Sequence, residues 1–154
     1  MISIWRIDKK RHSASTFSGE GAALYGGRWN PRGVRVVYAS QTLALAALEK
    51  FVHLEGVAGG ISFVSFRIDV PGSVKINHVD LSHLPKNWRS VSAPAATQDI
   101  GLNWTQKNET ALLRVPSTVI PSEYDYLINP LHTDFKHLKI SKPSPFSFDP
   151  RMWK

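Results

Sequence analysis

Residues 34–54, which read VRVVYASQTLALAALEKFVHL, place a strand directly before a helix. The segment 34–39 is rich in β-branched and aromatic residues and follows a turn, so it is predicted to be a strand. Ser40 is a suitable N-cap for a helix that runs to Leu54, because leucine, alanine and valine recur at three- and four-residue spacing. Gly56 is expected to end this helix.

The rest of the chain contains short strands and one further helix, joined by irregular connections. Strands are expected at residues 2–7, 61–70, 111–115, 119–120 and 124–128. Residues 97–108 fit a helix, although Gly101 lowers its propensity. Residues 8–27 and 80–96 are expected to be loops, and the proline-containing tail, 136–154, to be extended on the surface. Without a regular strand–helix alternation or an internal repeat, this pattern predicts the α+β class.

Composition indicates a folded protein of an ordinary reducing compartment. The 154 residues are 42% hydrophobic and include 5 Trp, 7 Phe and 4 Tyr, enough for a core. The absence of cysteine excludes disulfides, thiolate zinc sites and a cysteine nucleophile. The histidines lack the spacing of a metal site, so no metal is expected. With neither a signal-peptide pattern nor a membrane-length apolar segment, we expect a cytoplasmic protein that does not enter a membrane.

The net charge of +7 indicates an anionic partner. A nucleic acid, a phosphate-bearing small molecule and an acidic protein surface all fit this charge. A solvated basic surface that only aids solubility fits it as well.

The segment 26–33, GGRWNPRG, has the composition of a ligand-binding turn. Its two glycines allow the backbone to approach a ligand closely. The planar guanidinium of Arg28 matches two oxygens of a phosphate group. The same spacing also fits an arginine that pairs with a carboxylate beneath a tight turn.

Glu49 is a carboxylate within the largely apolar helix that follows Tyr38. It lies at or beside the apolar stripe of that helix. In a cleft, such a group would orient a ribose hydroxyl or stabilise positive charge. An ordinary solvated glutamate is the alternative. His53 lies four residues after Glu49, on the same face of the predicted helix, and is expected to have a supporting role. His132 is expected to support a turn.

Ser117 lies between two prolines in the segment 115–121, VPSTVIP. Both flanks restrict its backbone, which favours a hydroxyl fixed for hydrogen bonding. No G-x-S-x-G motif surrounds Ser117, so it is not expected to be a hydrolase nucleophile. A simple kink in a strand explains the prolines equally well.

Taken in order, GGRWNPRG, VVYAS, ALAALEKFVH and LLRVPSTVIPSEYDYLINPLHTDF resemble the RES domain, the toxin of a bacterial toxin–antitoxin pair. The resemblance covers roughly residues 5–135 and implies one domain over residues 1–154. It implies a fold similar to that of ADP-ribosyltransferases, with short β-sheets flanked by helices around an NAD+ cleft. One difference is Asp125, where the resemblance implies an asparagine before Tyr126.

The resemblance also implies a site. Its catalytic residues would be Arg28, Glu49 and Ser117, and its NAD+-binding residues Arg28, Tyr38, Glu49, Ser117, Gly27 and Trp29. Arg28 would hold the diphosphate and Tyr38 the nicotinamide end, while Ser117 would orient the ribose and Glu49 would stabilise an oxocarbenium-like transition state. NAD+ is then a substrate and no prosthetic group is expected.

The resemblance leaves open which acceptor receives the ADP-ribosyl group. Phosphate, as a co-substrate, or water would make the chain an NAD+ phosphorylase or glycohydrolase, whereas a protein acceptor would make it an ADP-ribosyltransferase. The family implies an Xre-like helix-turn-helix antitoxin that blocks the cleft and binds DNA in place of the toxin, and it is compatible with a homo-oligomer. A non-enzymatic basic module that binds nucleic acid is the alternative from another class.

Overall fold

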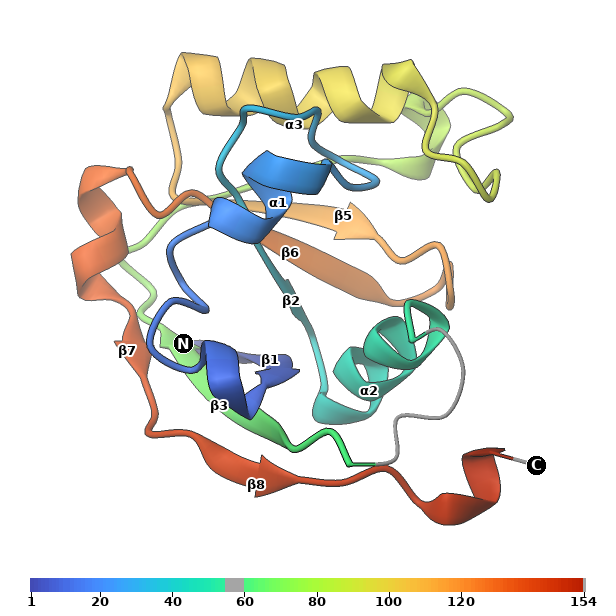
Figure 1. Ribbon diagram of the computed structural model, residues 1–154. Helices are drawn as coiled ribbons and strands as arrows, with labels where there is room; N and C mark the ends of the chain where they lie inside the picture. The colour runs from blue at the N-terminus through green and yellow to red at the C-terminus, as the bar shows by residue number, and fades with distance from the viewer. Residues whose placement is uncertain (55–59, 154) are drawn as a thin grey trace.

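The computed structural model describes residues 1–54 and 60–153, and its strands pair into one twisted sheet (Figure 1). The strands are β1 (Ile2–Lys9), β2 (Val37–Ser40), β3 (Phe63–Val70), β4 (Ile76–His78), β5 (Leu112–Pro116), β6 (Tyr124–Ile128), β7 (Lys139–Ile140) and β8 (Ser144–Phe146). Their order is β4-β5-β6-β2-β1-β3-β7, and β8 also pairs with β3. Among the described strands, β4 and β5 form the one parallel pair. The α+β class is confirmed, and the strands expected in short sheets are joined in one.

The sheet changes direction where β1 meets β2, because these strands share one registered pair, Trp5 opposite Ser40. Figure 1 shows β5 and β6 crossing above β1 and β3, with β2 running between the two halves. The antiparallel register of β2 and β6 places Tyr38 opposite Leu127 and Ser40 opposite Asp125. The chain leaves the sheet just beyond this point and forms the next helix.

Helices cover the sheet unevenly. The α-helices of the described chain are α1 (Glu20–Tyr25), α2 (Leu43–Val52) and α3 (Ala95–Lys107), and the 3-10 helices are η1 (Lys10–His12), η2 (Leu81–His83), η3 (Thr133–His137) and η4 (Pro150–Trp153). The helix α2 packs against β1 and β2. The helix α3 contributes Trp104 to a core cluster with Leu113 of β5 and Leu127 of β6. Each half of the sheet is therefore covered by its own helix.

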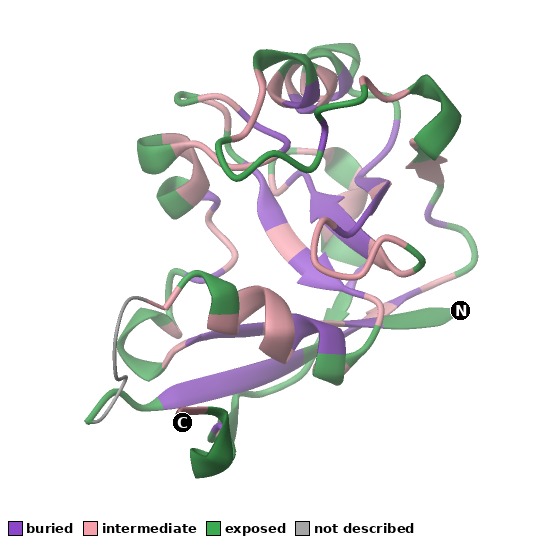
Figure 2. Ribbon diagram, turned by 90° about the vertical axis from the view of Figure 1, so that its right-hand side faces the viewer, coloured by how far each residue is buried: buried purple, intermediate pink, exposed green. Residues whose placement is uncertain are grey.

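Alternation of side chains along the strands divides the core between the two faces of the sheet. Val37 and Ala39 of β2 pack in one cluster, whereas Tyr38 of β2 and Val36, just before it, pack in the cluster beneath α3. A third cluster joins α2 to the C-terminal tail, where Phe148 packs with aromatic residues of α2 and β3. In Figure 2 the buried residues gather on the strands, and the outer sides of the helices are exposed.

Gly101 allows α3 to lie directly on the loop that carries Arg28. A Cβ at this position would collide with the carbonyl oxygen of Trp29. Trp29 is itself 2% exposed, and its indole packs in the same cluster as Trp88 and Trp104. The glycine that lowers helix propensity is thus required by packing, and the predicted helix is confirmed with a start two residues earlier, at Ala95.

The other predicted elements are confirmed with shifted ends, apart from a few errors. The helix cap is Thr42 and not Ser40, because Oγ1 of Thr42 accepts a hydrogen bond of 3.0 Å from the amide of Leu45. Ser40 belongs to β2. This helix ends at Val52, before the predicted Leu54, and Gly56 lies outside the described residues.

Three predicted segments differ from the structure. The strand predicted at residues 119–120 is wrong, because the amides of Val119 and Ile120 both turn towards the side chain of Ser117. The loop predicted at residues 8–27 contains η1 and α1, and the one at residues 80–96 contains η2 and the start of α3.

The tail is extended as predicted over β7 and β8, which lie along β3, and it then forms η4. The turn role of His132 is confirmed, because its Nδ1 accepts a hydrogen bond of 2.9 Å from the amide of Asp134. Across residues 1–54 and 60–153, no helix has both the length and the apolar character to cross a bilayer.

Candidate active site

Glu49 and Ser117 meet where α2 lies beside the connection that follows β5 (Figure 1). The hydroxyl of Ser117 donates a hydrogen bond of 2.6 Å to Oε1 of Glu49. Oγ of Ser117 also accepts hydrogen bonds of 3.0 Å from the amides of Val119 and Ile120. Because these two donors occupy the oxygen, the hydroxyl hydrogen is directed at Glu49. Ser117, which is 0% exposed, therefore fixes the carboxylate of Glu49.

Arg28 brings a half-buried cation into the same region. Its Nη1 donates to the carbonyl of Trp88 at 3.1 Å and its Nη2 to that of Val91 at 3.4 Å. Burial lowers the pKa of Arg28, an effect that the charge of Glu49 opposes. The arginine thus anchors the 88–91 loop through carbonyls, and its attraction to Glu49 acts through space.

The backbone of the Arg28 loop is fixed from α3. Oγ1 of Thr97 donates to the carbonyl of Arg28 at 2.7 Å, and Nε2 of Gln98 donates to the carbonyl of Gly27 at 3.0 Å. Both residues lie in the first turn of α3. The guanidinium of Arg28 is consequently carried by a rigid backbone.

Tyr38 of β2 holds the loop that carries Arg28 through its hydroxyl group. Its hydroxyl accepts a hydrogen bond of 3.1 Å from the amide of Trp29 and donates one of 2.6 Å to Oδ1 of Asn30. Burial raises the pKa of Tyr38 well above its ordinary value, so the phenol stays neutral. A Cβ on Gly27 would lie 2.7 Å from the Tyr38 hydroxyl oxygen, which explains a glycine at that position. Gly27 and Trp29 thus contact Tyr38 through backbone, and the indole of Trp29 faces the core.

Asp125 is a site residue whose contacts the sequence did not reveal. It is 8% exposed in β6, and Oγ of Ser40 donates a hydrogen bond of 2.6 Å to its Oδ1. Its carboxyl group also lies against that of Glu49, and burial together with this contact raises the pKa of Asp125. The sequence gives two signals at this position: a carboxylate at the second residue of the largely apolar strand YDYLI, and the difference from the asparagine that the family resemblance implies.

The site therefore combines an anion, Glu49, with a cation, Arg28. A hydroxyl group holds Glu49, and backbone carbonyls hold Arg28. A family model described as the RES domain matches residues 3–149. The chain belongs to the RES-domain toxin family. Its relatives include "Toxin Res" of Yersinia enterocolitica, 40% identical over 152 residues, which cover 98% of this chain and 99% of that one.

A second relative of this RES chain is "Prs ADP-ribosylating toxin" of Sphingobium sp., 40% identical over 156 residues, which cover 97% of this chain and 96% of the relative. Among solved structures, the MbcT–MbcA toxin–antitoxin complex of M. tuberculosis contains a chain that matches with a TM-score of 0.72 and 16% identity. The match covers 99% of this chain and 86% of that one. At this identity the likeness shows a shared fold.

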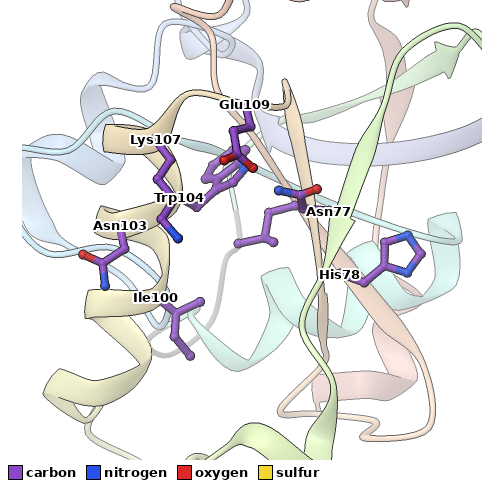
Figure 3. Close-up of a pocket in the computed structure, with 8 residues that line it drawn as sticks. Asn77, His78, Ile100, Asn103, Trp104, Lys107 and Glu109 are labelled. Carbon is purple, nitrogen blue, oxygen red and sulfur yellow. The ribbon is translucent and has the colours of Figure 1, made fainter.

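A separate pocket of this RES domain lies between α3 and β4 (Figure 3). It measures ≈ 380 Å³ and is lined by Asn77, His78, Ile100, Asn103, Trp104, Lys107, Glu109 and Leu113. None of the predicted site residues lines it. The predicted site at Arg28, Glu49 and Ser117 combines two opposite charges with a fixed hydroxyl, whereas the pocket is an open groove of mixed polarity.

Proposed function

We propose that this RES toxin consumes NAD+ by cleaving the bond between nicotinamide and ribose. The observation that carries the proposal is the carboxylate of Glu49, held by the Ser117 hydroxyl at 2.6 Å and attracted by Arg28. A fixed carboxylate beside an electropositive group suits a substrate that carries a diphosphate and develops positive charge on its sugar.

Cleavage of this bond transfers its electron pair to the nicotinamide nitrogen, which is cationic in NAD+ and becomes neutral. The positive charge passes to the ribose C1 and its ring oxygen. Glu49 would stabilise that charge, and Arg28 would bind the diphosphate. The leaving group needs no proton, so one carboxylate is sufficient for bond cleavage.

Capture of the sugar completes the reaction. Attack by water at C1 gives ADP-ribose and releases a proton, which makes the chain a glycohydrolase. Attack by inorganic phosphate gives ADP-ribose 1″-phosphate, which makes it a phosphorylase. We propose one of these two outcomes, with NAD+ as a substrate and not as a bound prosthetic group.

Transfer of ADP-ribose to a protein is the second candidate. The observation that favours it is the 40% identity to the Sphingobium relative, which is named an ADP-ribosylating toxin. The same carboxylate and arginine would serve both reactions, because these reactions differ only in the acceptor. The site therefore supports cleavage of NAD+ in either case.

We also propose that the toxin is held by an antitoxin of the Xre-like helix-turn-helix class in the cytoplasm. The structural neighbour was solved in a toxin–antitoxin complex. The net charge of +7 suits an acidic segment of such a partner. DNA binding would then belong to the antitoxin.

The acceptor is tested by incubating the purified chain with NAD+ labelled in its adenine ring, with and without phosphate. Free nicotinamide with labelled ADP-ribose or its 1″-phosphate supports NAD+ destruction, whereas label retained on a target protein supports transfer. Arg28→Ala is expected to raise the KM for NAD+, and the matched control is Arg32→Ala, an exposed arginine of the same loop. Full-length NAD+ in every reaction, with salt-sensitive binding of nucleic acid, would contradict both activities.

A further inference from the structure

Glu49 and Asp125 bring two carboxyl groups into hydrogen-bonding contact. Asp125 lies on β6 opposite Ser40, and Glu49 reaches it from α2. Two ionised carboxylates have only acceptor atoms and cannot hydrogen-bond to each other. The contact between them therefore requires one shared proton.

The surroundings of the two groups decide which one holds the proton. Glu49 is half-buried, receives the Ser117 hydroxyl hydrogen and is attracted by Arg28. Asp125 is 8% exposed and receives one hydroxyl hydrogen, that of Ser40, at 2.6 Å. The more deeply buried group without a cation in contact takes the proton.

Of the other titratable groups around the pair, Glu123 also favours the protonated form of Asp125. Glu123, at the end of the connection before β6, repels a charge on Asp125. Tyr38 of β2 also faces Asp125 and is neutral. Arg28 is a cation near the pair, and its charge attracts that of Glu49.

We propose that Asp125 is a positioning residue whose protonated carboxyl group donates a hydrogen bond to Glu49 and fixes it for the reaction proposed above, on which this assignment of a role rests. Glu49 is then held between two donors, Ser117 from the connection after β5 and Asp125 from β6. Ser40 holds Asp125 in turn, so four side chains form a continuous chain of hydrogen bonds.

The direction of the Asp125 pKa agrees with this arrangement. Burial raises the pKa of Asp125 well above its ordinary value of 3.8, and the contact with Glu49 raises it further, against the opposing effect of Ser40. When the pH rises through the raised pKa, Asp125 becomes charged and repels Glu49. The enzyme should therefore lose activity on the alkaline side through displacement of Glu49.

Asp125→Asn isolates the proton, because an asparagine amide is a permanent donor to Glu49 and its carbonyl still accepts from Ser40. Its kcat is expected to fall less than that of Asp125→Ala, and the alkaline loss caused by Asp125 should disappear. The matched control is Glu123→Gln, which removes a neighbouring charge without a shared proton. It should keep the alkaline loss, shifted slightly to lower pH, because removing the repulsion by Glu123 lowers the pKa of Asp125.

A second measurement needs no substrate. Because the folded state holds a proton on Asp125 that the unfolded state loses near pH 3.8, the free energy of unfolding of the wild type should decline as pH rises from there through the raised pKa. Asp125→Asn should lack this decline, so its stability relative to the wild type should increase with pH. A pH-independent difference between the two proteins would overturn the shared proton.

The two measurements separate the proposals. A pH-dependent stability difference without any NAD+ cleavage would leave the carboxyl pair intact and refute its role in the reaction and the proposed function. NAD+ cleavage with identical alkaline limbs and a constant stability difference in the wild type and Asp125→Asn would refute the inference and leave the proposed function standing.

Discussion

The hydroxyl of Ser117 donates a hydrogen bond of 2.6 Å to Oε1 of Glu49, although 68 positions separate the two residues in the sequence. The bond joins the connection after β5 to α2, and it orients a carboxylate that the charge of Arg28 attracts. The position of Glu49 is therefore set by tertiary contacts and not by its helix alone.

Ser117→Ala should slow nicotinamide release by about 10–100-fold, because Glu49 loses a donor that holds it. It should also lower the free energy of unfolding by about 1–3 kcal/mol, because the amides of Val119 and Ile120 lose their acceptor. Product release measured by chromatography and urea unfolding test the two effects. Ser122→Ala, an exposed serine in the same connection, is the control and should change neither. Unaltered kinetics in Ser117→Ala would remove Ser117 from the site.

Gly101→Ala should destabilise the fold by about 2 kcal/mol or more, because its methyl group would collide with the carbonyl of Trp29. Gly21→Ala in α1 is a matched control, since its methyl group would meet no described atom within 4 Å. The control should be as stable as the wild type or more stable by up to about 1 kcal/mol. Thermal unfolding of the three proteins makes the comparison, and an equal change in stability in both variants would show that the collision with the Trp29 carbonyl carries no cost.

Asp8 should stabilise the protein most near neutral pH. Burial alone would raise the pKa of Asp8, but Arg6, Thr16 and Lys50 stabilise its charge and lower the pKa below 3.8. A lowered pKa in the folded state gives a stabilisation that is present above pH 3.8 and is lost as pH falls through the folded value.

Asp8→Asn should accordingly be less stable than the wild type near neutral pH, with a difference that shrinks in acid. Urea unfolding across the acidic range measures it. Asp80→Asn, an exposed aspartate, serves as the control with a small effect throughout. A difference for Asp8→Asn that stays constant with pH would show that packing, and not charge, makes Asp8 important. The expected pH trend is opposite in sign to that of Asp125.

Local pattern predicted most of the strands and α3, because β-branched runs and turn residues act over a few positions. It failed where contacts with other parts of the chain determine the local structure. Ser40 and Thr42 are both suitable caps, and Ser40 is drawn into β2 by pairing with Asp125, which is 85 positions away. The apolar residues 119–120 resemble a strand, but their amides bind Ser117. The six-residue helix α1 is too short to show a periodicity.

The prediction of the candidate site residues required the family resemblance as well as the local sequence pattern. Arg28 and Glu49 have a chemical rationale in the sequence, whereas Tyr38 and Ser117 were selected by the family resemblance. The structure brings Glu49 and Ser117 into contact and places Tyr38 beneath the Arg28 loop. The contact of Asp125 with Glu49 joins β6 to α2, and no local spacing encodes such a contact. The catalytic roles of these residues remain predictions.

The most direct test of the central claim is the concentration of NAD+ in cells after induced expression of the chain without its antitoxin. The wild type should deplete NAD+ as growth stops, and Arg28→Ala and Glu49→Ala should preserve NAD+ at equal expression. Growth arrest by the wild type with an unchanged NAD+ concentration would contradict the claim.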